Sequence, residues 1–153
     1  MLWSSKSIAP AFVYDDGGRA QAGFKGKTSD CVCRALAIIT QIPYEQVYDQ
    51  IRIFLNNQPS RRSAKPSSPR TGVSKADTQR LIQHFGGIWQ PTMQIGKGCT
   101  VHLRKSELPA GRLIVNLTRH VAAVIDGQVH DNHDCSRNGT RCVYGYWKFP
   151  DQP

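Results

Sequence analysis

The chain has its first strongly apolar stretch between Cys31 and Thr40. Apolar residues recur there at near-helical spacing: Val32, Ala35, Leu36, Ile38 and Ile39. Directly before this stretch stand three residues of the types that cap helix N-termini: Thr28, Ser29 and Asp30. The pattern therefore predicts a mostly buried helix that starts at Cys31.

Two further helices are predicted in the first half of the chain. The run from Tyr44 to Leu55 places its apolar residues on one face of a helix. The run from Lys75 to Phe85 follows a capping Ser74 and stops at Gly86-Gly87.

After these glycines the hydrophobic pattern becomes β-like. The candidate strands are Ile88–Met93, Thr100–Leu103, Arg112–Leu117, His120–Ile125, Gln128–Asp131 and Val143–Phe149, with a short earlier strand at Ala11–Tyr14. Asp126-Gly127 between two apolar runs predicts a tight two-residue hairpin. The order of elements indicates an α+β fold, with N-terminal helices packed on a C-terminal antiparallel sheet.

The length of 153 residues predicts a single domain over residues 1–153. Residues 56–74 contain almost no apolar side chain, and we interpret them as a mobile basic loop. This loop carries four basic residues as a candidate binding segment: Arg61, Arg62, Lys65 and Arg70. A formal net charge of +9 favours acidic partners, such as an acidic protein or peptide, nucleic acid or an anionic membrane.

Membrane insertion is not expected, because no apolar run approaches the about 18–20 residues that a spanning helix needs. The first residues lack the apolar core of a secretory signal. An odd count of five cysteines without such a signal predicts reduced thiols and a cytoplasmic location.

Cys31 is the first candidate for a reactive residue. A thiol at a helix N-terminus lies at the positive end of the helix dipole, which favours the thiolate. The unpaired N–H groups of the first helical turn can also stabilise an oxyanion. Cys31 is therefore a candidate nucleophile.

His120 opens a predicted strand and is the candidate base. If Asp126-Gly127 forms a two-residue turn, His120 lies opposite His133 and diagonal to Asp131, within side-chain reach. A carboxylate in that position orients the imidazole and stabilises its charged form. A β-bulge in this hairpin would exchange the faces and make Asn132 the orienting residue.

These segments resemble the papain-like cysteine peptidase superfamily. The run Asp30-Cys31-Val32-Cys33-Arg34-Ala35-Leu36-Ala37 resembles its nucleophile helix, and the run from His120 to Asp131 resembles its histidine strand and hairpin. With the terminal run Arg141-Cys142-Val143-Tyr144-Gly145-Tyr146-Trp147, the pattern is similar to small phage and prophage proteins of that superfamily.

The resemblance implies a papain-like fold and a thiol-dependent hydrolase, either a cysteine peptidase or a related enzyme of acyl transfer or deamidation. It implies Cys31 as nucleophile, His120 as base and Asp131 as orienting residue, with no cofactor and no metal. One position departs from the family pattern: Lys25 stands where a glutamine usually supplies an oxyanion donor, and the nearest glutamine is Gln21. Thr28, Ser29 or the backbone of Cys31 would have to replace it.

Three alternatives remain open from the sequence. A zinc site from Cys135, Cys142, His130 and His133 has poor spacing for a structural zinc. Nucleic-acid binding by the basic loop lacks the interleaved aromatic residues of a stacking platform. The third is a catalytically weak or inactive papain-like scaffold that binds a host protein or nucleic acid through its basic surface.

Overall fold

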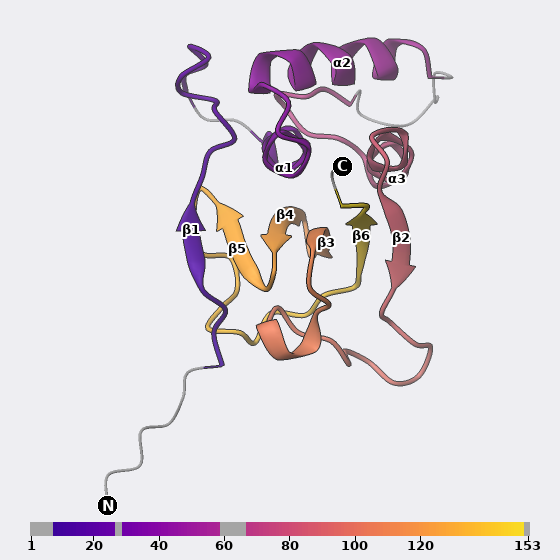
Figure 1. The fold of residues 1–153 in the computed structure, drawn as a ribbon. Helices are drawn as coiled ribbons and strands as arrows, with labels where there is room; N and C mark the ends of the chain where they lie inside the picture. Colours follow the sequence, from indigo (N-terminus) through magenta and orange to yellow (C-terminus); the bar gives the residue numbers. More distant parts are fainter. Residues whose placement is uncertain (1–7, 27–28, 59–66, 152–153) are drawn as a thin grey trace, which may run out of the picture.

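The computed structural model describes residues 8–26, 29–58 and 67–151 (Figure 1). The elements in chain order are β1 (Phe12–Tyr14), α1 (Cys31–Thr40), α2 (Tyr44–Asn56), α3 (Lys75–His84), β2 (Ile88–Pro91), the 3-10 helix η1 (Lys105–Glu107), β3 (Arg112–Leu117), β4 (His120–Ile125), β5 (Gln128–Asp131) and β6 (Gly145–Phe149). The α+β class and the three predicted helices are confirmed.

The strands form one six-stranded sheet in the order β1-β5-β4-β3-β6-β2. All neighbours are antiparallel except β1 and β5, which are parallel. The sheet is therefore mixed, and the prediction of a purely antiparallel sheet is wrong at this edge. Strands β1 and β5 are far apart in the sequence, so no hairpin turn constrains their relative direction.

The prediction of a strand at Thr100–Leu103 is also wrong. This segment makes only an isolated bridge, between His102 and Cys142, and joins no strand of the sheet. Single backbone hydrogen bonds hold it against the segment that precedes β6, such as the one from Val143 N–H to the Val101 carbonyl at 2.8 Å. Too few ladder bonds form for a regular strand.

Hydrophobic side chains pack on both faces of the sheet. Helix α1 lies over β4 on one face, and α2 covers α1 from outside (Figure 1). The core of that face includes Leu36 and Ile39 of α1 and Trp147 of β6. On the other face, Leu113, Val124 and Val129 pack against Leu103 and Leu108 of the connection between β2 and β3. The central strands β3 and β4 are thus buried on both faces, which fixes the strand end that carries His120.

A disulfide joins Cys99 to Cys142 and ties the connection after β2 to the segment before β6. It contradicts the expectation that all five cysteines are reduced. Cys31, Cys33 and Cys135 are free thiols.

In the described part of the chain, every helix is too short or too polar to cross a membrane.

Candidate active site

Cys31 is the first residue of α1 and is half-buried. Asp30 occupies the N-cap position, but its side chain does not cap the helix. The first regular bond of the helix runs from the Arg34 N–H to the Asp30 carbonyl at 3.0 Å. Earlier N–H groups of a helix have no partner within it, so the first turn offers donors beside the Cys31 sulfur.

The hairpin of β4 and β5 brings His120 and Asp131 together, as the sequence predicts. Ile125 pairs with Gln128 across Asp126-Gly127, and Val124 pairs with Val129. His120 Nε2 lies 2.7 Å from Asp131 Oδ2. Since the register shows no bulge between the paired residues, Asp131 takes the orienting position.

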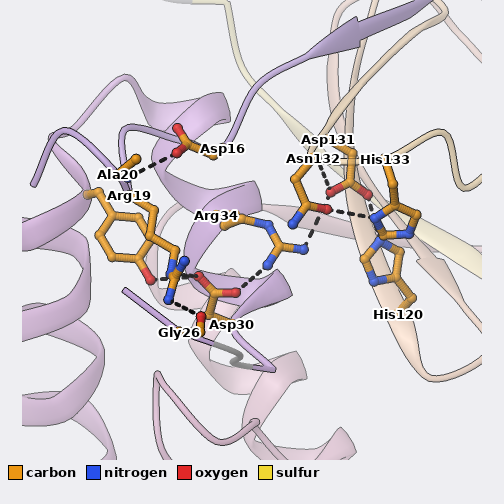
Figure 2. Close-up of polar contacts among 11 residues, drawn as sticks. Asp16, Arg19, Ala20, Gly26, Asp30, Arg34, His120, Asp131, Asn132 and His133 are labelled. Atoms are coloured by element: carbon orange, nitrogen blue, oxygen red, sulfur yellow. Dashed lines mark hydrogen bonds and ion pairs between the residues drawn. The ribbon is translucent and has the colours of Figure 1, made fainter. Parts of the chain in front are cut away.

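Asn132 does not take that position. Its backbone N–H donates to Asp131 Oδ1 at 2.7 Å, and its side-chain oxygen lies 2.6 Å from His133 Nδ1. Figure 2 shows this arrangement, in which Asp131 stands between the two histidine rings and the Arg34 guanidinium. The backbone of Asn132 therefore helps to hold the carboxylate that contacts His120.

Cys31 and His120 line the same cavity, and the imidazole acts on the thiol electrostatically. Burial raises the pKa of the Cys31 thiol. The hydrogen bonding and positive charge of His120 lower this pKa, with smaller contributions from the Val121 N–H and Arg34, and together they outweigh burial. The net pKa of Cys31 is below its ordinary value. This combination favours a thiolate beside an imidazolium.

The imidazole responds in the opposite direction. Burial lowers the pKa of His120, but hydrogen bonds to Asp131, Cys135 and Cys31 raise it, to about 11. Burial likewise raises the pKa of Asp131, and the hydrogen bond and charge of His120 more than offset this, so its carboxyl stays ionised. Because Nε2 faces Asp131, the other ring nitrogen is left for a thiol.

A buried arginine, which the sequence analysis did not single out, connects the nucleophile helix to the orienting carboxylate. The guanidinium of Arg34 forms ion pairs with Asp30 and with Asp131, the latter at 3.4 Å (Figure 2). Asp30 also accepts a hydrogen bond from the Tyr44 hydroxyl at 2.7 Å and lies 3.5 Å from Arg19 Nε. The i, i+4 spacing of Asp30 and Arg34 in an otherwise apolar helix is the sequence signal that indicates this role.

The other thiol of α1 has a different environment. Burial raises the pKa of Cys33 to about 12, so this thiol stays protonated at neutral pH. Its side chain is fully buried among the core residues between α1 and the sheet. Two cysteines that are two positions apart thus have opposite tendencies to ionise, and only Cys31 lies beside a base.

Cys31 and His120 open into a cavity of about 430 Å³. Its walls come from the start of α1, the segment before α3, α3 itself and the adjoining ends of β3 and β4. Apolar side chains form most of it: Val32, Val73, Trp89, Leu117, Val121 and Trp147. A substrate carbonyl group therefore has room beside the thiol.

Lys25, at the position of the family glutamine, is exposed and does not line this cavity. Ser29, one of the expected replacements, does line it, whereas Thr28 lies outside the described residues. Two half-buried carboxamides that the sequence analysis missed, Gln79 of α3 and Asn116 of β3, line it as well. The cavity thus contains amide donors that come from elements other than the loop before Cys31.

Arg70 of the predicted basic segment is exposed and donates to the Lys25 carbonyl at 3.2 Å. Arg61, Arg62 and Lys65 lie outside the described residues. Near Arg70, backbone hydrogen bonds between Ser68 and Gly72 close a turn, which places Gly72 at the rim of the cavity.

The zinc ligands considered from the sequence do not come together, because Cys142 is in the disulfide. A different set is close: His120, Asp131 and His133 each place one ligand atom within 4.8 Å of the others. A cation bound there would coordinate His120 and compete with Cys31 for this imidazole. The hydrogen bond of His120 to Asp131 and the guanidinium of Arg34 already satisfy this carboxylate without a cation.

Comparison of the chain with models of protein families, with curated proteins and with solved structures gives no match.

Proposed function

We propose that this chain is a thiol-dependent hydrolase of papain-like architecture, a cysteine peptidase or a related enzyme of acyl transfer or deamidation. One observation carries the proposal: His120 contacts the Asp131 carboxylate at 2.7 Å, and it lines one cavity with the Cys31 thiol at the start of α1, whose pKa it lowers. Nucleophile, base and orienting acid in this relation form a catalytic triad. Their order in the chain, Cys–His–Asp, is that implied by the papain-like resemblance.

In the proposed reaction, the Cys31 thiolate attacks a carbonyl carbon of an amide, and the carbonyl π electrons move to oxygen. N–H groups of the first turn of α1 stabilise this oxyanion. The carbonyl re-forms as the C–N bond breaks, and His120 gives its proton to the leaving amine. The product is a thioester on Cys31 and a free amine.

In deacylation, His120 acts as a base, whereas it acted as an acid in the first step. His120, now neutral, accepts a proton from water as the water oxygen attacks the thioester carbon. The C–S bond then breaks, which releases a carboxylic acid and restores the thiolate beside the imidazolium. Asp131 stays ionised throughout and keeps the ring in place.

The rate of alkylation of Cys31 by iodoacetamide tests this proposal, with peptide mass to identify the modified cysteine. We expect Cys31 to react at pH 6 faster than Cys33 or Cys135, and His120→Ala to slow it by about tenfold or more. The matched control is His84→Ala, because His84 is exposed near the end of α3 and outside the site. A chelator in all samples excludes a bound cation at His120.

A Cys31 that reacts no faster than a free thiol in solution would refute the proposal. The inactive scaffold that binds a host protein or nucleic acid would then be the better explanation of the basic surface. Equal slowing in His120→Ala and His84→Ala would also contradict it, since of these two histidines only His120 lies in the cavity with Cys31.

A further inference from the structure

The mouth of the cavity beside Cys31 carries positive charge without a balancing acid. Lys75 and Arg119 line the cavity, and among the described residues of its lining none is an aspartate or a glutamate. Lys75 is the first residue of α3, and Arg119 stands in the turn between β3 and β4. Two separate elements therefore each bring one cation to the same opening.

Neither of these two cations is neutralised by an acid in the part of the chain that the structure describes. Among the ion pairs of the described residues, none includes Lys75 or Arg119. The other arginines near the site are engaged, because Arg34 pairs with Asp30 and Asp131 and Arg19 pairs with Asp30. The free charge at the site thus lies at the cavity mouth, where low-dielectric walls strengthen its field.

Below the charged mouth the cavity is apolar and firmly packed. Trp89 and Trp147 lie with ring centroids 4.6 Å apart at an angle of 47°. Gly145 lies close to the six-membered ring of Trp89, where a Cβ atom would collide with it. This contact holds Trp89 in place, so the apolar wall of the cavity is preformed rather than assembled around a ligand.

We propose that this cavity selects substrates in which an apolar group lies next to a carboxylate. The apolar group occupies the cavity beside Trp89, and Lys75 and Arg119 attract the carboxylate at the mouth. This inference rests on the proposed function for the statement that the ligand is a substrate. The binding preference itself follows from the charge and shape of the cavity and does not need a reactive thiol.

The test is an NMR titration of the full chain carrying Cys31→Ser, which removes any covalent reaction. The probes are phenylacetate and phenylacetamide, which have nearly the same shape and differ in charge. We expect the anion to bind more tightly, with the shifted resonances around the cavity. Lys75→Glu and Arg119→Glu should each weaken phenylacetate by about two- to fivefold, as loss of an exposed charge contact implies.

Lys148→Glu is the matched control, because it makes the same change of charge at an exposed residue of β6 that does not line this cavity. It should leave the preference for the anion unchanged. Equal affinity for the acid and the amide would overturn the inference, and so would equal losses in Lys148→Glu and the two mouth variants.

The result is separable from that of the alkylation experiment. If phenylacetate binds selectively while native Cys31 reacts as an ordinary thiol, the anion site stands and the hydrolase proposal fails. If Cys31 is reactive but the two probes bind alike, the hydrolase proposal stands and the substrate class is wrong.

Discussion

The buried Asp131 carboxylate has different partners at its two oxygens, and its burial strengthens both sets of contacts. It accepts from His120 at one oxygen, and at the other it faces the Asn132 N–H and the Arg34 guanidinium. In a site with little water, each of these contacts is stronger than on the surface. The position of the ring is therefore determined by the carboxylate, and the position of the carboxylate by the arginine.

Replacing Asp131 by asparagine should make Cys31 less reactive at mildly acidic pH. The carboxylate raises the pKa of His120, and the imidazolium lowers that of Cys31. Without the negative charge the imidazole deprotonates more easily, the pKa of Cys31 rises, and alkylation at pH 6 falls by about tenfold for each unit of that rise. Alkylation rates from pH 4 to 9 measure it.

In the wild type, the thiolate is lost as pH falls through the lowered pKa of Cys31, and the imidazolium is lost only as pH approaches about 11. We expect a broad plateau of alkylation between these limits. Asp49→Asn, at an exposed residue of α2, is the control and should keep the wild-type profile. An unchanged profile in Asp131→Asn would show that the carboxylate does not act on the thiol.

Replacing Arg34 by methionine should destabilise the whole domain. The change leaves the carboxylates of Asp30 and Asp131, both almost fully buried, without their shared cation. Breaking a buried ion pair from one side costs about 3–5 kcal/mol. Urea denaturation gives the free energy of unfolding.

Arg52→Met is the comparison for this variant, because Arg52 pairs with Asp49 at the surface with both side chains more than half exposed. Such a pair contributes about 0–1 kcal/mol. Similar losses in the two variants would mean that the Arg34 network contributes no more than a surface pair.

At the scale of elements, the helix starts determine the shape of the cavity. Helix α1 brings Cys31, and α3 brings Lys75, Thr78 and Gln79 to the opposite wall. The start of α3 is held by Ser74, whose hydroxyl accepts from the Asp77 N–H at 3.3 Å. This cap therefore fixes a wall of the site as well as a helix.

Removing the cap with Ser74→Ala should lower the free energy of unfolding by about 1 kcal/mol. The Ser74 hydroxyl also contacts the Asp77 carboxylate at 3.0 Å, so the substitution removes one hydrogen-bond partner of that carboxylate. Thermal or urea unfolding measures the change. Ser106→Ala in η1, at an exposed serine, should have almost no effect, and a loss there as large as in Ser74→Ala would contradict the capping argument.

Most elements and the candidate triad could be predicted because they depend on local signals. The apolar run that begins at Cys31 and the Asp126-Gly127 turn each specify geometry over a few residues. The turn then fixes the register that places Asp131 beside His120. These are short-range relations that hydrophobic period and turn chemistry determine.

The parts that escaped prediction depend on distant pairings. The parallel contact of β1 with β5 and the disulfide between Cys99 and Cys142 join segments that no turn connects. The contact of Arg34 with Asp131 spans 97 positions, and the carboxamides of Gln79 and Asn116 meet only in the folded cavity. Hydrophobic periodicity carries no information on such pairs.

For the whole molecule, the disulfide closes a loop over a sequence separation of 43 that contains β3, β4 and β5. The loop therefore includes both His120 and Asp131. By the chain-entropy estimate, a cross-link of this length stabilises the folded state by about 4 kcal/mol. The strands that carry the base are thus enclosed by a covalent ring, whereas Cys31 lies outside it.

Reduction of the disulfide should lower the melting temperature without removing a triad residue. We expect three titratable thiols in the denatured oxidised protein, the free Cys31, Cys33 and Cys135, and five after reduction. Calorimetry with and without reductant measures the loss of stability. The Cys99→Ser/Cys142→Ser variant serves as control and should melt at one temperature under both conditions; a wild type that is equally insensitive would refute the stabilising role.

The order of the elements also has a consequence for the protein while it is being made. The ribosome releases Cys31 long before His120 and Asp131, and β6, which fits between β3 and β2, follows still later. Until then α1 has no sheet to pack on, and its thiol has neither imidazole nor buried arginine bridge beside it. A nascent chain thus exposes a cysteine without its base, and the proposed reactivity of Cys31 can arise only after synthesis has passed the last third of the sequence.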